Sequence, residues 1–310
     1  MKVYKDLAAL PRFRKAVITI GSYDGVHAGH QAIIQRINNI AKEQGGESIM
    51  ITFYPHPRFV VRPDDPFKLI NTIDERAELL SKTGLDYLII HPFSIAFSRL
   101  TALDFVRKIL VNQLNTSKLI IGYDHHFGKN REGNLEQLTE YSHLYNFEVE
   151  EIPAQDINDV SVSSTKIRKA LSAKNIKTAN KYLGYNFMLN GTVVNGKQLG
   201  GKIGFPTANI NVKEDYKLIP KTGVYVVKSK IKNAVVFGMM NIGFRPTLEG
   251  KHQTIEVHFF DFENDLYNQN LTIEILYFLR DEEKFESVEK LISQLNKDKK
   301  IALNYIQNNL

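Results

Sequence analysis

Two histidines flank a glycine in the segment GSYDGVHAGH, residues 21–30 of a chain of 310 residues. His27 and His30 stand three residues apart, directly after an apolar run. A pair at this spacing fits three kinds of site: a metal ion, a tightly packed turn, or a bound phosphate. A metal site stays open but unsupported, because a catalytic zinc needs a third protein ligand and no zinc motif joins the pair to another histidine. The spacing alone does not choose between a structural turn and phosphate binding.

The sequence on either side predicts the element boundary at which the pair lies. The run AVITI, residues 16–20, is typical of a buried strand, and residues 31–46 have apolar side chains at helical spacing before a glycine pair. The histidines therefore lie where a strand leads into a helix N-terminus, which presents free N–H groups and a positive dipole end. Gly29 lets the backbone approach an anion closely. This context favours phosphate binding, with both imidazoles donating to oxygens whose charge grows in a phosphoryl transition state.

The first part of the chain alternates strand and helix patterns. Strands are expected in the runs AVITI, SIMITF, DYLIIHPF, KLIIGYD and FEVEEI. Helical patterns lie between them at residues 30–44, 74–83, 101–114 and 134–145. This order predicts an α/β domain of Rossmann-like type, a parallel sheet with helices on both faces, in which ligands bind outside the carboxyl ends of the strands. Beyond residue 185, short strands separated by glycine-rich turns predict a small antiparallel β-barrel domain with a terminal helix. We place the two domains at residues 1–184 and 185–310.

Composition narrows the functional class. The chain has no cysteine, which excludes disulfides, thiolate chemistry and cysteine-based zinc sites. We find no signal-peptide pattern and no apolar run of membrane-spanning length, so we expect a cytoplasmic protein without a membrane partner. The net charge is +6, but no dense basic run is interleaved with aromatic residues. We therefore expect small-molecule ligands rather than nucleic acid.

Two segments of the β domain carry groups that suit phosphate and metal chemistry. GGKIGFPTANI, residues 200–210, is a glycine-rich turn that can hold phosphate with backbone N–H groups, and Thr207 and Asn209 offer oxygen ligands suited to Mg²⁺. In TIEVHFFDF, residues 254–262, strand alternation separates Glu256 from its apolar neighbours, as a general base facing a cleft requires. A plain β-turn and an exposed strand glutamate are the alternatives, and the residues alone do not reject them.

A series of motifs resembles one family over nearly the whole chain. GSYDGVHAGH is similar to the HxGH signature of nucleotidyltransferases, and TFYPHPRFV, GYDHHFGKNREG and SSTKIRKAL follow in the order found in bacterial bifunctional riboflavin kinase/FAD synthetases. GFPTAN, GVY, NIGFRPT, EVHFF and FLRDEEKF resemble the riboflavin kinase domain. The resemblance implies that the C-terminal domain phosphorylates riboflavin to FMN with Mg²⁺-ATP. It also implies that the N-terminal domain adenylylates FMN with ATP, giving FAD and pyrophosphate.

The resemblance further implies roles for residues of the N-terminal domain. His27 and His30 would stabilise the adenylyl transition state and contact ATP phosphates. Ser164, Thr165 and Arg168 would hold the phosphates that leave as pyrophosphate. The two hydroxyl residues suit the N-cap of a helix, and the guanidinium of Arg168 can bind two phosphate oxygens at once. The other nucleotide and flavin contacts would come from Gly21, Asp24, Gly29, Gly122, Asp124, Phe127 and Arg131.

In the C-terminal domain the resemblance implies which residues bind the nucleotide and the metal and which residue acts as the base. Thr207 and Asn209 would bind Mg²⁺-ATP next to Gly204. Glu256 would take the proton of the ribityl hydroxyl, and Arg280 would lie near the flavin and the nucleotide. Tyr23, where the family often has Phe, and Asn195, where it often has His, are departures that we expect to be tolerated.

Two other functions compete with this interpretation. The N-terminal domain could adenylylate a different phosphorylated small molecule, but the kinase-like domain beside it argues against this. The chain could also be a basic RNA-binding protein with a β-barrel, for which stacking aromatics on a basic sheet face would be expected. The distinctive residues of the expected barrel are instead a phosphate-type loop and a glutamate.

Overall fold

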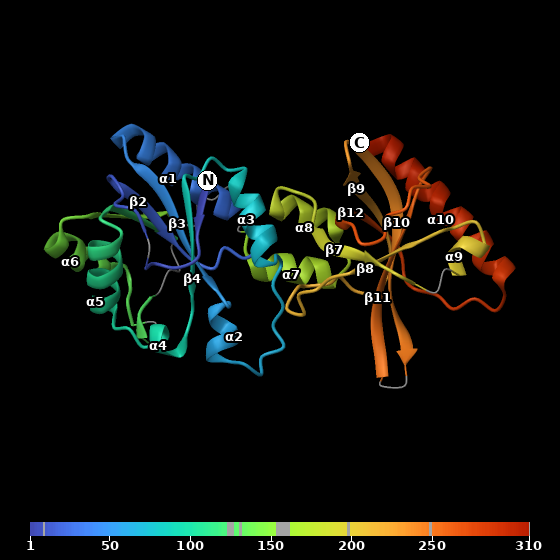
Figure 1. Ribbon diagram of the computed structural model, residues 1–310, viewed down its shortest axis with the longest axis horizontal. Helices are drawn as coiled ribbons and strands as arrows, with labels where there is room; N and C mark the ends of the chain where they lie inside the picture. Colours follow the sequence, from blue (N-terminus) through green and yellow to red (C-terminus); the bar gives the residue numbers. More distant parts are fainter. Residues whose placement is uncertain are drawn as a thin grey trace. The chain divides into compact units, whose positions relative to one another are not determined.

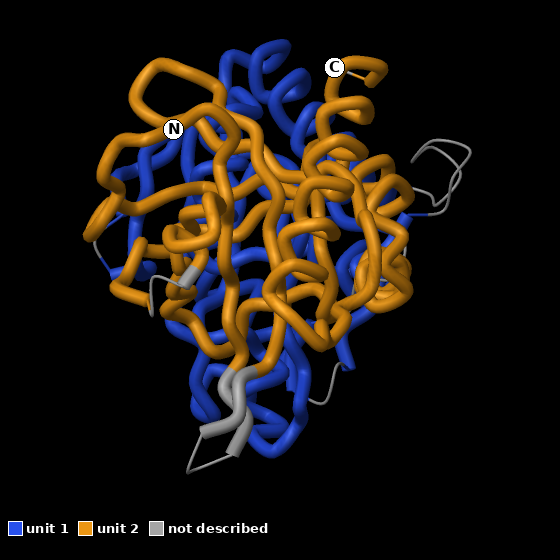
Figure 2. Tube along the Cα trace, turned by 90° about the vertical axis from the view of Figure 1, so that its right-hand side faces the viewer, with its two compact units in different colours: residues 1–164 blue, residues 165–310 orange. Residues whose placement is uncertain are grey.

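The structure is a computed structural model that describes residues 1–8, 10–122, 127–129, 132–152, 162–196, 199–247 and 250–309. The chain divides into two compact units, residues 1–164 and 165–310 (Figure 2). The division lies N-terminal to the predicted boundary, so that α7 (Ser164–Ser172) and α8 (Ile176–Leu183) group almost entirely with the second unit. The domain boundary at residues 184 and 185 stays a prediction.

The first unit contains a parallel six-stranded sheet in the order β1-β4-β3-β2-β5-β6 (Figure 1). Its strands are β1 (Lys2–Tyr4), β2 (Ala16–Ile20), β3 (Glu47–Tyr54), β4 (Tyr87–Pro92), β5 (Thr116–Gly122) and β6 (Glu148–Ile152). Its helices are α1 (Ala28–Gln44), α2 (Pro57–Val61), α3 (Ile73–Ser81), α4 (Ile95–Ser98), α5 (Ala102–Phe105), the π-helix η1 (Val106–Gln113) and α6 (Leu135–Tyr145). The parallel sheet with its helices confirms the predicted α/β class.

Both faces of this sheet are buried, which explains why its strands are continuous apolar runs. Ile18 of β2 joins one core with Phe105, at the end of α5. Val17, on the opposite face, joins a second core with Ile34 and Ile37 of α1. Because α1 packs directly against the strand that precedes it, the connection between β2 and α1 is held at both ends.

The second unit is a closed antiparallel barrel in the strand order β10-β11-β8-β7-β12-β9 (Figure 1). Its strands are β7 (Met188–Val194), β8 (Ala208–Asn211), β9 (Gly223–Ile231), β10 (Ala234–Thr247), β11 (Gly250–Phe259) and β12 (Asn270–Arg280). The short helix α9 (Leu199–Lys202) precedes β8, and the terminal helix α10 (Val288–Asn309) packs through Ala302 on a cluster that includes Val224 and Leu276. The predicted barrel with a terminal helix is confirmed.

Candidate active sites

The segment between β2 and α1 is a tight turn with an unusual backbone. Gly21 opens the turn, and φ is positive at Tyr23 (47°), Gly25 (97°) and Val26 (37°). A non-glycine residue in the left-handed region costs about 1–3 kcal/mol, so neighbouring contacts must hold such a turn. Tyr23 is buried, and its hydroxyl is hydrogen-bonded to Thr19 of β2. The turn thereby carries the chain from the carboxyl end of the strand into the N-terminus of α1.

His27 is the N-cap residue of α1, and its imidazole lies face to face with that of His30. The ring centroids are 3.5 Å apart and the ring planes differ by 16°. Nδ1 of His27 accepts a hydrogen bond from the backbone N–H of His30 at 3.3 Å. An accepting Nδ1 carries no proton, so the neutral ring of His27 bears its hydrogen on Nε2 and donates from there. The two histidines therefore lie at the helix N-terminus that the flanking pattern predicted, and the contact between their rings is a further finding of the structure.

Burial keeps both imidazoles neutral. His27 is 5% exposed, and burial lowers its pKa from 6.5 to about 4. The pKa of His30 is lowered well below 6.5, first by burial and then by the nearby His27 and Arg76. At pH 7 the pair therefore offers N–H donors without positive charge of its own.

Arg76 is a buried cation beside this pair that sequence reasoning missed. It lies on α3, is 1% exposed, and donates from Nη1 to Oγ1 of Thr52 at 3.0 Å. Thr52 in turn donates to the backbone carbonyl of Ser22 in the turn at 3.3 Å. The capping box of Thr72 and Glu75 marks the start of α3 in the sequence, but only tertiary packing directs the following arginine toward the turn.

The carboxylate of Asp24 holds the turn to another part of the unit. It is 2% exposed and accepts the backbone N–H groups of Ile70 at 2.9 Å and Asn71 at 3.2 Å. Its backbone carbonyl accepts the hydroxyl of Ser164 at 2.7 Å, which brings this predicted residue against the turn. Asp24 therefore has a structural role here, and its predicted ligand contact stays a prediction.

Other predicted residues of the first unit lie at element ends or in the core. Gly29 is buried in the first turn of α1, and Gly122 ends β5, the strand beside β2. Phe127 is 8% exposed and packs against Phe105 with ring centroids 5.7 Å apart. The ring of Phe127 thus belongs to the hydrophobic core of this unit.

Four further residues were predicted for the same reaction. Asp124 and Arg131 lie outside the described residues. Thr165 and Arg168 follow Ser164 on α7 and belong to the second compact unit. Their roles stay predictions.

In the barrel, Glu256 is the middle member of a row of polar residues on three neighbouring strands. On β11 it pairs with Asn209 of β8 and with Asn241 of β10. Directly paired residues of antiparallel strands point to the same face, with Cβ atoms about 4.5–5.5 Å apart. Glu256 is half-buried, whereas Ile255 and Val257 on the other face are buried. The register therefore sets the predicted base beside one of the predicted metal ligands.

The side chain of Asn209 is confined by Gly196, near the start of the β7–β8 connection. A Cβ atom added to Gly196 would lie 2.6 Å from Cγ of Asn209, closer than real Cβ contacts allow. Any larger residue at position 196 must therefore displace the amide of Asn209.

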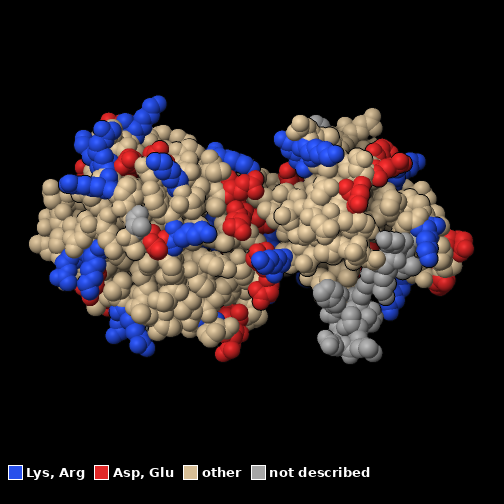
Figure 3. Space-filling view, in the orientation of Figure 1, with Lys and Arg blue, Asp and Glu red and all other residues tan. Residues whose placement is uncertain are grey.

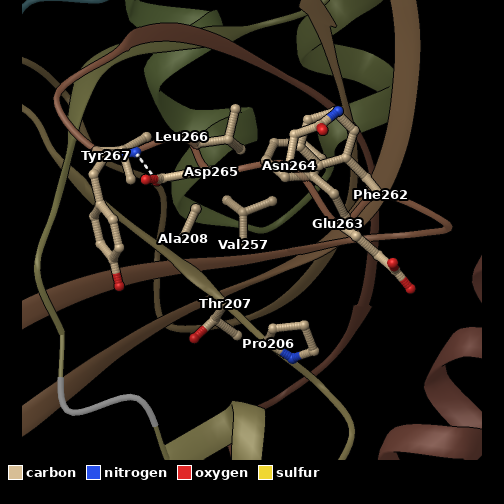
Figure 4. Close-up of a pocket in the computed structure, with 12 residues that line it drawn as sticks. Pro206, Thr207, Ala208, Val257, Phe262, Glu263, Asn264, Asp265, Leu266 and Tyr267 are labelled. Carbon is tan, nitrogen blue, oxygen red and sulfur yellow. Dashed lines mark hydrogen bonds between the residues drawn. The ribbon is translucent and has the colours of Figure 1, made fainter.

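Thr207 lines a cavity of about 160 Å³ at the start of β8 (Figure 4). Pro206, Thr207 and Ala208 form one side of it, and residues 262–267 form the facing side. Within that loop the carboxylate of Asp265 accepts the backbone N–H of Tyr267 at 2.8 Å. Sequence reasoning missed residues 262–267, because FENDLY is a polar connection that any pair of strands could have.

Gly204 and Arg280 are the remaining predicted residues of the barrel. Gly204 has a φ of 82° in the turn that leads to Thr207. Arg280 donates through Nε and Nη2 to the carboxylate of Asp298 on α10, at 3.0 and 2.8 Å, and Asp298 is 1% exposed. Its Nη1 donates to the backbone carbonyl of Asp281 at 2.8 Å. Arg280 therefore links the end of β12 to the terminal helix. Its position near the flavin and the nucleotide stays a prediction.

On the face drawn in Figure 3, basic and acidic side chains are interspersed among uncharged ones. Within the described part of the chain, we find no helix that is both long enough and apolar enough to cross a membrane.

Comparison with known proteins identifies both halves of the chain. The FAD synthetase family matches residues 10–166, and the riboflavin kinase family matches residues 183–306. The bifunctional riboflavin kinase/FMN adenylyltransferase of Listeria monocytogenes is 38% identical, over 91% of this chain and 90% of its own length. The enzyme of the same name from Escherichia coli is 33% identical, over 92% of this chain and 91% of its own length.

A solved structure supports the fold. A Streptococcus pneumoniae protein described as a macrolide-efflux protein is 31% identical, with a TM-score of 0.88, and the match covers 98% of each chain. The two family matches lie in chain order on the two predicted domains, and full-length relatives combine both activities in one polypeptide. This chain belongs to the family of bifunctional riboflavin kinases/FMN adenylyltransferases.

Proposed function

We propose that the turn at residues 21–30 is the catalytic centre of FMN adenylylation and that Glu256 with Asn209 forms the centre of riboflavin phosphorylation. The chain carries both activities of its family, phosphorylation of riboflavin to FMN and adenylylation of FMN to FAD. The observation that supports the assignment is the separation of the two polar clusters, one in each family match.

In the adenylylation step, a phosphate oxygen of FMN attacks the α-phosphorus of ATP, and pyrophosphate leaves. The substrate supplies the nucleophile, so the protein has to position the groups and stabilise the charge that grows on non-bridging oxygens. Nε2–H of His27 donates to these oxygens at the positive end of the α1 dipole. Stacking on His30 and the bond to its backbone N–H fix the ring before the substrate binds.

The start of α7 suits the phosphates that leave as pyrophosphate. The hydroxyl of Ser164 donates its proton to the carbonyl of Asp24. The start of α7 is also the positive end of a helix dipole, which suits anions. The hydroxyl of Thr165 and the guanidinium of Arg168 are assigned to the same phosphates.

In the phosphorylation step, Glu256 accepts the proton of the ribityl hydroxyl as that oxygen bonds to the γ-phosphorus of ATP and ADP leaves. A half-buried carboxylate on the barrel wall, next to the amide of Asn209, is positioned to do this. We place the phosphates of ATP at Asn209, on the same face of the barrel wall as Glu256.

The residues at this position fit a magnesium ion. The hydroxyl of Thr207 and the amide oxygen of Asn209 are hard ligands, and Mg²⁺ is commonly bound by one or two protein groups together with substrate phosphates. Within the described residues, no group of three or more His, Asp or Glu side chains could hold a metal ion, so the phosphates of ATP would supply further ligands. When bound, Mg²⁺ neutralises charge on the transferred phosphoryl group.

The assignment is tested by assaying the two steps separately in His27→Ala and His30→Ala. FAD formation from supplied FMN should fall by about 10²-fold or more in each variant, while riboflavin phosphorylation should be retained. His143→Ala, at an exposed position of α6, is the matched control and should keep both activities. The assignment is wrong if a folded histidine variant loses riboflavin phosphorylation or keeps normal adenylylation.

A cytoplasmic location is part of the proposal. Both reactions consume ATP, and their flavin substrates and products are used inside cells.

A further inference from the structure

Strand β11 presents two neighbouring residues, Glu256 and His258, to the same segment of chain. Glu256 pairs with Asn209, and Val257 pairs with Ala208. The next rung of this ladder would set His258 opposite Thr207. The β8–β11 ladder ends at Ala208, the first residue of β8, and Pro206 beyond Thr207 has no N–H with which to extend it.

The side chain of His258 makes the contact that the backbone ladder does not. Its Nδ1 lies 2.8 Å from the carbonyl oxygen of Pro206. A carbonyl oxygen can only accept, so Nδ1 carries the hydrogen and donates it. Burial lowers the pKa of His258 below 6.5, so the ring is neutral at pH 7 and its single proton stays in this bond.

The imidazole is itself held firmly in place. His258 is 8% exposed, and it lies edge-on to Phe205 at 5.1 Å and to Phe260 at 5.8 Å between ring centroids. The Pro206 carbonyl and the N–H of Thr207 belong to one rigid peptide plane. Fixing the carbonyl therefore fixes the direction in which the chain enters Thr207.

We propose that His258 is a positioning residue for riboflavin phosphorylation, which holds the Pro206–Thr207 peptide so that the Thr207 hydroxyl meets the metal–nucleotide complex. Glu256 and His258 then act from one strand, the first as the base and the second on the segment that binds the phosphates. This inference rests on the proposed role of Thr207.

Two variants separate the hydrogen bond from the ring packing. His258→Phe keeps an aromatic ring between Phe205 and Phe260 but removes the donor. His258→Asn loses the ring but keeps a donor, because the amide nitrogen of asparagine stands close to the place of Nδ1. The KM for ATP, the Mg²⁺ concentration for half-maximal rate, and the KM for riboflavin are measured for each variant, with thermal unfolding as a check of folding.

His258→Phe should lower kcat/KM for Mg²⁺-ATP about tenfold, the effect of one lost hydrogen bond, with the KM for riboflavin unchanged. His258→Asn should recover most of that loss, and both variants should convert supplied FMN to FAD normally. A folded His258→Phe variant with normal ATP and Mg²⁺ dependence overturns the proposal, as does an equal deficit in His258→Asn. If His258→Phe does not fold, His258→Gln replaces it. The amide nitrogen of glutamine lies one bond further from the backbone than Nδ1 of histidine, so it does not reach the Pro206 carbonyl in the same way. His258→Gln should show the same deficit, and normal behaviour would overturn the proposal.

Thr207→Val, alone and combined with His258→Phe, shows whether His258 acts through Thr207. The double variant should be no worse than Thr207→Val alone, because the same interaction is already lost. Additive losses overturn the proposal for His258 and leave the role of Thr207 intact. Normal Mg²⁺ dependence in Thr207→Val refutes the role of Thr207 itself, and the inference falls with it.

Discussion

The imidazole of His27 stacks on that of His30 with centroids 3.5 Å apart, and its Nδ1 accepts the backbone N–H of the same partner. Protonation of both rings would place two positive charges in contact, and burial already disfavours the charged form of each. The arrangement thus depends on neutral rings, which suits donation to phosphate and makes the turn sensitive to acid.

We expect the stability of the first unit to fall between about pH 6.5 and pH 4. The folded pKa of His27 is lowered to about 4, so in this range the unfolded chain binds a proton that the folded chain does not. Each such group costs roughly 1.4 kcal/mol per pH unit. Thermal unfolding at pH 7.5, 6 and 5 measures the slope, which should be shallower in His27→Gln. An unchanged slope in that variant contradicts the explanation.

Asp24→Ala should destabilise the first unit by about 2–4 kcal/mol, because two backbone N–H groups lose a buried, charged acceptor. Asp74→Ala, at an exposed position in α3, should change stability by about 0.5 kcal/mol or less. Denaturant unfolding of the two variants gives the comparison. Equal losses would show that the bonds to Ile70 and Asn71 do not hold the turn.

Glu256→Gln should reduce FMN formation by roughly 10²- to 10⁴-fold, since the amide keeps the size of the side chain but removes its basicity. Conversion of supplied FMN to FAD should be unaffected. Glu274→Gln, at a strand position where the carboxylate contacts Lys228 and Asn186, should keep riboflavin kinase activity. Near-normal turnover in Glu256→Gln would show that Glu256 is an ordinary strand residue and not the general base.

Gly196→Ala should lower riboflavin kinase activity by roughly 10- to 10²-fold through displacement of the Asn209 amide. Asn195→Ala is the matched control, because Asn195 is the exposed neighbour of Gly196 and has no assigned ligand. Rates at low and high Mg²⁺ should show a higher Mg²⁺ requirement in Gly196→Ala only. If both variants behave alike, the close approach of Gly196 has no functional role.

The fragment 165–310 should be more stable than 185–310 by about 3–5 kcal/mol, and both should phosphorylate riboflavin. The longer fragment keeps α8, which buries Ala179 and Leu183. It also keeps Asn180, whose amide donates to the carbonyl of Ile275 on β12 at 2.9 Å. Urea unfolding and FMN assays of both fragments test this. Equal stability would show that α8 is dispensable for the barrel, and a folded but inactive 185–310 would contradict the predicted domain boundary.

Much of the fold follows from local patterns. The parallel sheet is visible in the sequence as continuous apolar runs with helical patterns between them. The barrel is visible as short strands separated by glycine-rich turns. Residues 101–114, predicted as one helix, fold as α5 followed by the π-helix η1. Periodicity shows which side chains face a core, but it does not distinguish the hydrogen-bonding pattern of the backbone within a helix.

The sequence by itself determined the architecture of both units, the place of His27 and His30 at a strand–helix junction, and the separation of Glu256 from its apolar neighbours. Each of these depends on residues close together in the chain. Only the tertiary structure decided that Arg76 lies beside the histidines, that Asp24 binds the backbone at residues 70 and 71, and that His258 holds Pro206. These contacts join residues 24 to 52 positions apart. Their side chains meet because packed elements bring distant segments together, and helical or strand spacing carries no information about which segments those are.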